Sequence, residues 1–222
     1  MPTVQNISIP YDDGVTSGRF VNAGGETGVV FAHGAGVGQD HEWMVSVRKG
    51  LAASGIPVLT FNYPYMEAGR KAPNPPKKLL ACHRAALTVM RDRVARVVLA
   101  GKSMGGRMGS HLAAGDGSAA DREPIAGLVF FGYPLVGVGK TEPRDVSHLS
   151  EVGVPMLFVQ GTRDRLAPID LIRGVAKSLP ATDIHVVEDG DHSFRVLKRT
   201  GRHPQEVIDE VVAVTANWIT QL

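Results

Sequence analysis

The chain has 222 residues, of which 43% are hydrophobic and 21% charged, the ordinary balance of a water-soluble globular protein. Its 24 basic and 22 acidic side chains leave a formal net charge of +2, so nucleic acid and membrane surfaces are not expected as partners. The single cysteine, Cys82, excludes an intrachain disulfide, and no apolar run approaches the roughly 20 residues of a membrane span. Residues 1–10 lack the pattern of a signal peptide, so a cytoplasmic protein is expected.

The beginning of the chain predicts an antiparallel edge hairpin. Residues 4–9 and 19–21 have the pattern of short strands around the turn Asp12-Asp13-Gly14. After this hairpin, apolar runs rich in β-branched residues alternate with helix-like segments, which predicts a parallel sheet covered by helices on both sides.

Six parallel strands are expected, at residues 28–32, 57–61, 96–100, 125–131, 155–159 and 183–187. Helices are expected at residues 42–54, 78–93, 104–114, 168–178 and 204–220. The fold class is therefore α/β, a three-layer α/β/α sandwich with about seven or eight strands, in one domain over residues 1–222. The loop at 133–153 is too short for a large cap domain.

The motif with the clearest chemical content is Gly101-Lys102-Ser103-Met104-Gly105, which matches Gly-x-Ser-x-Gly between an expected strand and an expected helix. In this context the serine occupies a sharp turn, the nucleophile elbow, and flanking glycines avoid collisions with neighbouring backbone. The turn presents the hydroxyl at the sheet edge, above a helix N-terminus that favours negative charge. The alternative interpretation is a serine that only caps the helix.

A nucleophilic serine needs a base within hydrogen-bond reach. Among eight histidines, His192 follows the last expected strand and precedes the last helix, where a loop can carry its ring over Ser103. Asp164 follows the fifth strand and is the expected carboxylate partner of that ring. Asp189 and Asp191 are second choices because they lie so close to His192 in the chain. Six other histidines are expected on the surface: His41, His83, His111, His148, His185 and His203.

The loop at residues 33–38, His-Gly-Ala-Gly-Val-Gly, predicts an oxyanion hole. Such a loop lets amides approach a substrate oxygen, and we expect the amide of Met104 to act with that of Ala35, or alternatively Gly36. His33 is expected to orient this loop. The candidate substrate-binding residues are His33, Tyr63, Tyr65 and Tyr133.

Cofactors and metals are not predicted. The loop at 33–38 does not fit Gly-x-Gly-x-x-Gly, and Arg96 stands where a phosphate-binding loop ending in Gly101-Lys102-Ser103 would need a glycine. The sequence has no His-Glu-x-x-His helix and no Cys/His cluster at ligand spacing.

Four motifs together resemble the α/β-hydrolase superfamily over residues 28–220. They are the loop at 33–36, the elbow at 101–106, Gly161-Thr162-Arg163-Asp164, and Asp191-His192-Ser193-Phe194. The chain is most similar to small members near dienelactone hydrolase. Its Lys-Ser-Met-Gly-Gly-Arg elbow and proline-rich basic loop resemble the subgroup of testis-expressed protein 30 and the hydrolase-like subunit of a histone-acetyltransferase complex.

This resemblance implies a serine hydrolase that cleaves small carboxylic esters and needs no cofactor. The reaction of dienelactone hydrolase is not transferred, because that enzyme uses a cysteine nucleophile. The alternatives are a non-catalytic binding or scaffold protein, or a thioesterase, acyltransferase or peptidase with the same site. The expected partner is a small-molecule ester, and a homodimer is compatible with the sequence. We expect four basic residues to be solvated surface charges, with attraction of an acidic substrate as the alternative: Arg70, Lys71, Lys77 and Lys78.

Overall fold

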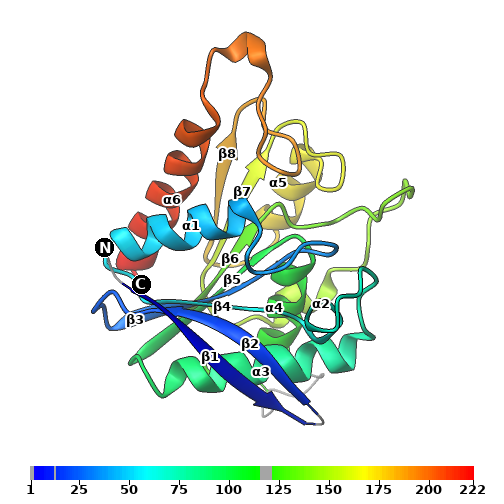
Figure 1. Ribbon diagram of the computed structural model, residues 1–222. Helices are drawn as coiled ribbons and strands as arrows, with labels where there is room; N and C mark the ends of the chain where they lie inside the picture. Colours follow the sequence, from blue (N-terminus) through cyan, green and yellow to red (C-terminus); the bar gives the residue numbers. More distant parts are fainter. Residues whose placement is uncertain (1–2, 13, 116–121) are drawn as a thin grey trace.

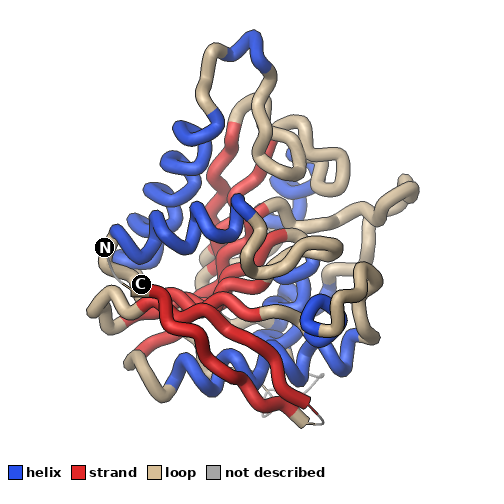
Figure 2. Tube along the Cα trace, viewed as in Figure 1, coloured by secondary structure: helices blue, strands red, loops and turns tan. Residues whose placement is uncertain are grey.

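The computed structural model describes residues 3–12, 14–115 and 122–222, so Asp13 of the expected turn lies outside the described residues. Eight strands in this part of the chain form one sheet (Figures 1 and 2). They are β1 (Val4–Tyr11), β2 (Gly14–Val21), β3 (Thr27–Ala32), β4 (Val58–Phe61), β5 (Arg96–Lys102), β6 (Gly127–Phe131), β7 (Met156–Gly161) and β8 (Thr182–Val187). Their order across the sheet is β1-β2-β4-β3-β5-β6-β7-β8.

The sheet is mostly parallel. β1 pairs with β2, and β2 with β4, in antiparallel fashion, while every later neighbouring pair is parallel. The carboxyl ends of β3, β5, β6, β7 and β8 therefore meet along one edge, which is where loops of such sheets gather functional side chains.

Helices cover both faces of the sheet (Figure 1). On one face lie α1 (Glu42–Ala53) and α6 (Pro204–Thr220), and on the other lie α3 (Pro76–Arg91), α4 (Met104–Ala114) and α5 (Ile169–Lys177). Shorter turns are α2 (Pro64–Glu67) and the 3-10 helices Ser147–Glu151 and Lys198–Thr200. Among the described residues, none of the helices combines the length and the apolar character that a membrane span requires.

Two apolar cores explain why the parallel strands are hydrophobic nearly throughout. Along β3, Val29 and Phe31 pack on the α1 and α6 side, whereas Val30 and Ala32 pack on the opposite side. Side chains alternate between faces in a strand, so a strand buried on both faces needs apolar residues at every position. The predicted α/β sandwich with its N-terminal edge hairpin is confirmed.

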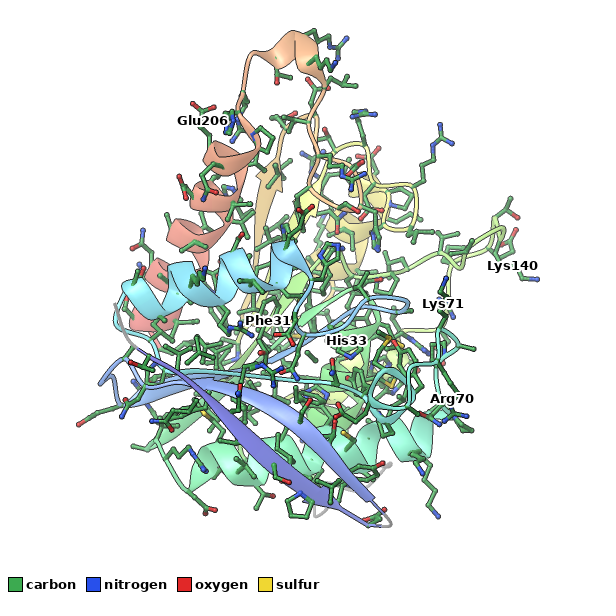
Figure 3. All side chains as sticks on the ribbon, in the orientation of Figure 1. Phe31, His33, Arg70, Lys71, Lys140 and Glu206 are labelled. Atoms are coloured by element: carbon green, nitrogen blue, oxygen red, sulfur yellow. The ribbon has the colours of Figure 1, made fainter. Side chains whose placement is uncertain are left out.

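The start of α6 shows how local sequence sets an element's boundary. Pro204 occupies the first turn, where its missing N–H is not needed, and the His203 side chain accepts a hydrogen bond from the amide of Gln205. In return, the Glu206 carboxylate, labelled in Figure 3, accepts from the amide of His203. The helix accordingly begins where the sequence predicts.

His83 corrects one expectation, because it is fully buried and not a surface residue. It lies on the apolar face of α3, and its Nδ1 is 3.1 Å from the hydroxyl oxygen of Tyr63. Burial, with a smaller contribution from nearby His33, lowers the pKa of His83 to about 3. The spacing of Leu79, His83 and Met90 was the available signal, since all three lie on one helical face.

This burial predicts a pH-dependent stability. Between pH 6.5 and 4 the unfolded chain binds a proton at His83 that the folded chain does not, so the contribution of His83 lowers the free energy of unfolding by roughly 1 kcal/mol for each pH unit that the pH falls. In urea unfolding at pH 6.5, 5.5 and 4.5, the free energy of unfolding of His83→Gln should fall less steeply with falling pH than that of wild type. The exposed His41→Gln is the control and should leave the slope unchanged. Parallel declines for wild type and His83→Gln would contradict the assignment.

Candidate active site

Ser103 sits in a strained turn between β5 and α4. Its φ of 50° and ψ of −115° lie in a region that residues other than glycine rarely adopt, and its amide donates to the carbonyl of Phe131 at 3.0 Å. Glycines make the turn sterically feasible. A Cβ on Gly101 would lie 2.1 Å from the Gly106 nitrogen, and a Cβ on Gly105 would lie 2.4 Å from the carbonyl oxygen of Ala32. Helix α4 therefore packs directly against the backbone of two strands.

The structure brings Ser103, His192 and Asp164 together in one hydrogen-bonded chain. His192 Nδ1 is 2.7 Å from Asp164 Oδ2, and His192 Nε2 is 2.9 Å from Ser103 Oγ. Because a carboxylate only accepts hydrogen bonds, Nδ1 carries the proton of a neutral ring and Nε2 accepts from the serine hydroxyl. This is the arrangement in which an imidazole can act as a base toward serine.

Asp164 is a buried and fully hydrogen-bonded carboxylate. Its Oδ2 also accepts from Gln160 Nε2 at 2.9 Å, and its Oδ1 accepts from the amides of Leu166 and Ala167 at 2.8 and 3.2 Å. Burial acts to raise the pKa of Asp164, but the hydrogen bonds from His192, Gln160 and Leu166 outweigh it and lower the pKa below its ordinary value. An ionised Asp164 holds the ring of His192 in the tautomer just described.

The loop that carries His192 is held at several points. Asp191 Oδ1 accepts from the amides of Ser193 and Arg195 at 2.8 and 2.9 Å. The ring of Phe194, whose φ is 59°, stacks on Trp43 of α1 with centroids 5.6 Å apart. Asp191 therefore builds the turn around His192, and the Asp189 carboxylate accepts from Arg199 instead.

Gly132 is a site residue that the sequence analysis missed. It follows β6 with a φ of +67°, and a Cβ there would lie within 3.1 to 3.3 Å of three functional atoms. These atoms are Asp164 Oδ2, Lys102 Nζ and His192 Nδ1. The absence of a side chain at Gly132 therefore leaves room for the carboxylate of Asp164 and the ring of His192.

The loop after β3 packs against the elbow. A Cβ on Gly34 would lie 3.6 Å from that of Ser103. His33 Nε2 accepts from the amide of Tyr63 at 2.9 Å, so its Nδ1 carries the proton and donates to the Gly34 carbonyl at 2.7 Å. Burial, opposed by this backbone contact, lowers the pKa of His33 to about 4, so the ring is neutral and orients the loop (Figure 3).

The amides of Met104 and Ala35 form no hydrogen bond within the described ranges, so both remain available to an incoming oxygen. Burial raises the pKa of the Tyr65 phenol, and the nearby backbone of Gly36 opposes this increase. Tyr65 also donates weakly to the Gly34 carbonyl, at 3.4 Å.

The four candidate substrate-binding residues lie deeper than expected. His33, Tyr63, Tyr65 and Tyr133 are at most 1% exposed, so they pack behind the site, which argues against direct contact with a substrate. The exposed side chains of Arg70 and Lys71 lie at the outer margin of the molecule, on the loop after α2 (Figure 3). Their placement agrees with solvated surface charges.

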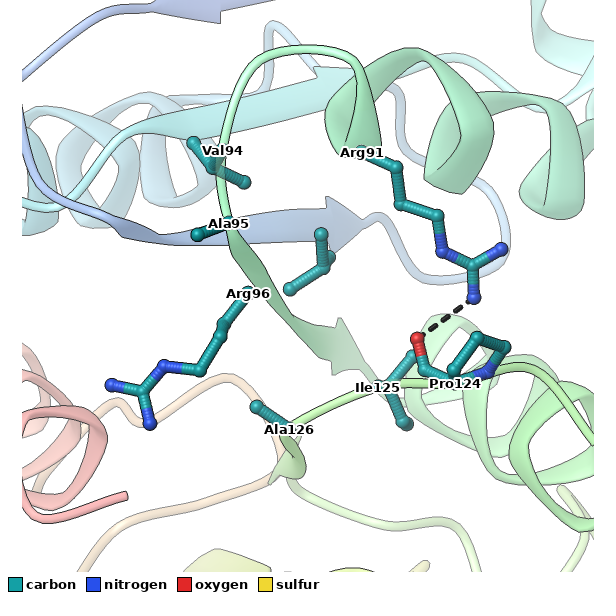
Figure 4. Close-up of a pocket in the computed structure, with 8 residues that line it drawn as sticks. Arg91, Val94, Ala95, Arg96, Pro124, Ile125 and Ala126 are labelled. Atoms are coloured by element: carbon teal, nitrogen blue, oxygen red, sulfur yellow. Dashed lines mark hydrogen bonds between the residues drawn. The ribbon is translucent and has the colours of Figure 1, made fainter.

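A hollow of about 420 Å³ lies elsewhere (Figure 4). Its lining includes Val94, Arg96 and Ile125, together with Arg91, which donates to the carbonyl of Pro124 at 2.8 Å. These residues lie at the amino-terminal end of β5, whereas Ser103 follows its carboxyl end, roughly 20 Å along the strand. The hollow is therefore separate from the site. No group of three or more metal-ligating side chains occurs among the residues that the structure describes.

Comparison with known proteins supports the fold described above. A family model for the α/β-hydrolase domain matches residues 25–220, and the chain belongs to the α/β-hydrolase family. It is similar to the dienelactone hydrolase of Anabaena variabilis, with 19% identity, a TM-score of 0.77 and coverage of 99% of this chain and 98% of that one. It is also similar to the Pyrococcus furiosus esterase Pf2001, with 18% identity, a TM-score of 0.75 and coverage of 98% and 94%. At these identities the likeness concerns the fold.

Gly132 and Gly139 provide a matched pair of substitutions. Both have a φ near +70°, but a Cβ on Gly139 would meet nothing within 4 Å. Gly139→Ala should therefore lower the free energy of unfolding by only about 1–2 kcal/mol, the cost of a left-handed backbone conformation. Gly132→Ala should lower the free energy of unfolding by about 1–3 kcal/mol more than Gly139→Ala does. Asp164 is held by four hydrogen bonds and cannot move away from the added methyl group. Urea unfolding measures both; equal losses would contradict the crowding at Gly132.

Proposed function

We propose that this protein is a serine hydrolase that cleaves small carboxylic esters through an acyl-enzyme. The observation that carries the proposal is the chain of hydrogen bonds from Ser103 Oγ through the His192 ring to Asp164, at 2.9 and 2.7 Å. Family membership and the likeness to esterases support the same reaction class. The short segment between β6 and β7, with no inserted cap domain, favours small substrates.

In the first half of the reaction, His192 Nε2 takes the hydroxyl proton as Ser103 Oγ attacks the ester carbonyl carbon. The carbonyl oxygen becomes an oxyanion, which the amides of Met104 and Ala35 bind. The tetrahedral species then collapses: the carbon–oxygen bond to the alcohol breaks, and His192 gives its proton to the departing alkoxide. Ionised Asp164 stabilises the positively charged ring between these steps.

In the second half, water repeats the attack. His192 removes a proton from water as the water oxygen adds to the acyl carbon, and returns that proton to Ser103 Oγ as the acid leaves. Each turnover consumes one ester and one water and releases one alcohol and one carboxylic acid. Every group that these steps require is a side chain or amide of the chain itself.

The assignment to the testis-expressed protein 30 subgroup is likewise a proposal. It is supported by the Lys-Ser-Met-Gly-Gly-Arg elbow at residues 102–107. The subgroup assignment does not identify a substrate. Thioesters, and acyl acceptors other than water, should therefore be assayed together with the esters.

The test is hydrolysis of p-nitrophenyl acetate and butyrate by wild type, Ser103→Ala and Asp164→Asn. Ser103→Ala should lower kcat/KM at least about 10³-fold, and Asp164→Asn should lower kcat by about 10²–10⁴-fold because the ring loses its tautomer control. Ser150→Ala, an exposed serine, is the matched control and should keep full activity. Wild-type activity that survives in Ser103→Ala would refute the proposal. A folded wild type without activity toward esters and thioesters would favour the non-catalytic alternative.

A further inference from the structure

The side chain of Lys102, the residue before the nucleophile, turns into the protein and contacts the loop that carries the base. It is only 9% exposed, and its Nζ donates to the main-chain carbonyl of His192 at 2.5 Å. The same ammonium lies 5.4 Å from the centroid of the Phe194 ring, a cation–π contact. Lys102 therefore holds both His192 and the residue two positions later.

This ammonium is an unusual group to bury. Among the described residues, no carboxylate lies within ion-pair distance of Lys102. The charged groups that face it are Asp164, from the loop after β7, and Asp191, from the loop after β8. Burial of a cation without a carboxylate partner costs free energy, and an apolar side chain of similar length would avoid this cost. The retained charge therefore needs a functional explanation.

We propose that Lys102 is a positioning residue for the base, which anchors the main chain of His192 while Ser103 and Asp164 hold its ring. This inference rests on the proposed hydrolase function. The dipeptide Lys102-Ser103 then contacts His192 at two points, the ammonium at the carbonyl oxygen and the hydroxyl at Nε2. Because both residues belong to the same elbow, nucleophile and base are fixed to one rigid element.

The geometry around the loop shows why an anchor is needed. The residue after Ser193, Phe194, has a φ of 59°, and Asp189 has a φ of 57°, so the loop is strained on both sides of His192. The hydrogen bonds at the ring set its rotation and Asp191 shapes the turn that follows, while the Lys102 ammonium contacts the main chain of His192 itself. A displacement of about 1 Å in a reacting group can cost about 10²-fold in rate, so a fixed main chain matters to the base.

The anchor has a pH signature. Burial lowers the pKa of Lys102 to about 8, against smaller opposing effects of Asp164 and Asp191. Above that pH the ammonium becomes an amine and the charge-assisted hydrogen bond to His192 weakens, so activity should fall. Folding stability should change the other way. Between about pH 8 and 10.5 the unfolded chain keeps a proton that the folded chain has lost, so stability attributable to Lys102 rises with pH.

The experiment compares wild type, Lys102→Met and Lys102→Arg in kcat, KM and fluorophosphonate labelling rate from pH 6 to 9.5, with thermal unfolding at pH 7. Lys102→Met should lower kcat about tenfold with KM within about twofold, show no alkaline decline, and unfold no earlier than wild type. Lys102→Arg keeps the charge and should retain more activity, with its alkaline decline shifted beyond the range. Lys140→Met, at an exposed loop tip in Figure 3, is the control and should match wild type.

The inference is overturned if Lys102→Met keeps the wild-type kcat and alkaline decline. If Lys102→Met does not fold, the other two proteins decide: a wild type without an alkaline decline, and an arginine variant with the same profile, would overturn it. Ser103→Ala, assayed in parallel, separates the two proposals. Undiminished labelling of Ser103→Ala would mean that the hydrolase proposal fails, whereas an inactive Ser103→Ala beside an unaffected Lys102→Met would mean that only the role of Lys102 fails.

Discussion

Helix α4 begins directly against the backbone of strands β3 and β5, and this close contact fixes the position of Ser103. Gly101 and Gly105 leave no room for a Cβ, so the helix begins directly at the edge of the sheet and Ser103 is held at a φ of 50°. A strained residue of this kind persists only where its surroundings determine its conformation. Here the strain places the hydroxyl above the sheet, where loops from other strands can reach it.

Parallel strand pairing brings those loops to Ser103. β5, β6, β7 and β8 are consecutive neighbours, so their carboxyl ends lie side by side. Gly132 follows β6, Asp164 follows β7 and His192 follows β8, and each of these strands lies one place further from β5, the strand that precedes Ser103. The imidazole spans the remaining distance. The hydrogen-bonded chain does not follow the order of the strands, because the His192 ring, from the loop after the outermost strand β8, lies between Ser103 and Asp164.

Much of this arrangement could be predicted from sequence, for an identifiable reason. The strand–helix alternation is visible because both faces of the sheet are apolar, and Ser103, Asp164 and His192 each directly follow an expected strand. The predicted helix at 104–114 coincides with α4, and the predicted helix at 204–220 coincides with α6. Local pattern is sufficient where burial alone decides the structure.

Residues whose roles depend on neighbours across the sheet escaped prediction. Lys102 pairs in register with Phe131, which brings Gly132 and the ammonium together, and nothing local to either residue reports this. Gln160 reaches Asp164 only because the turn after β7 folds back on the strand. For Tyr63, Tyr65 and Tyr133 the prediction was wrong in the opposite direction. The sequence suggests that they contact a substrate, but their large and mostly apolar rings are buried in the core.

In the proposed reaction, the Ser103 oxygen is the nucleophile and His192 activates it. The most direct measurement is mass-spectrometric mapping of the peptide modified by a fluorophosphonate, in wild type and in His192→Gln. We expect a single adduct on the peptide that contains Ser103, formed by wild type and lost or greatly slowed in His192→Gln. An adduct on another residue, or equal labelling of Ser103 in the two proteins, would contradict it.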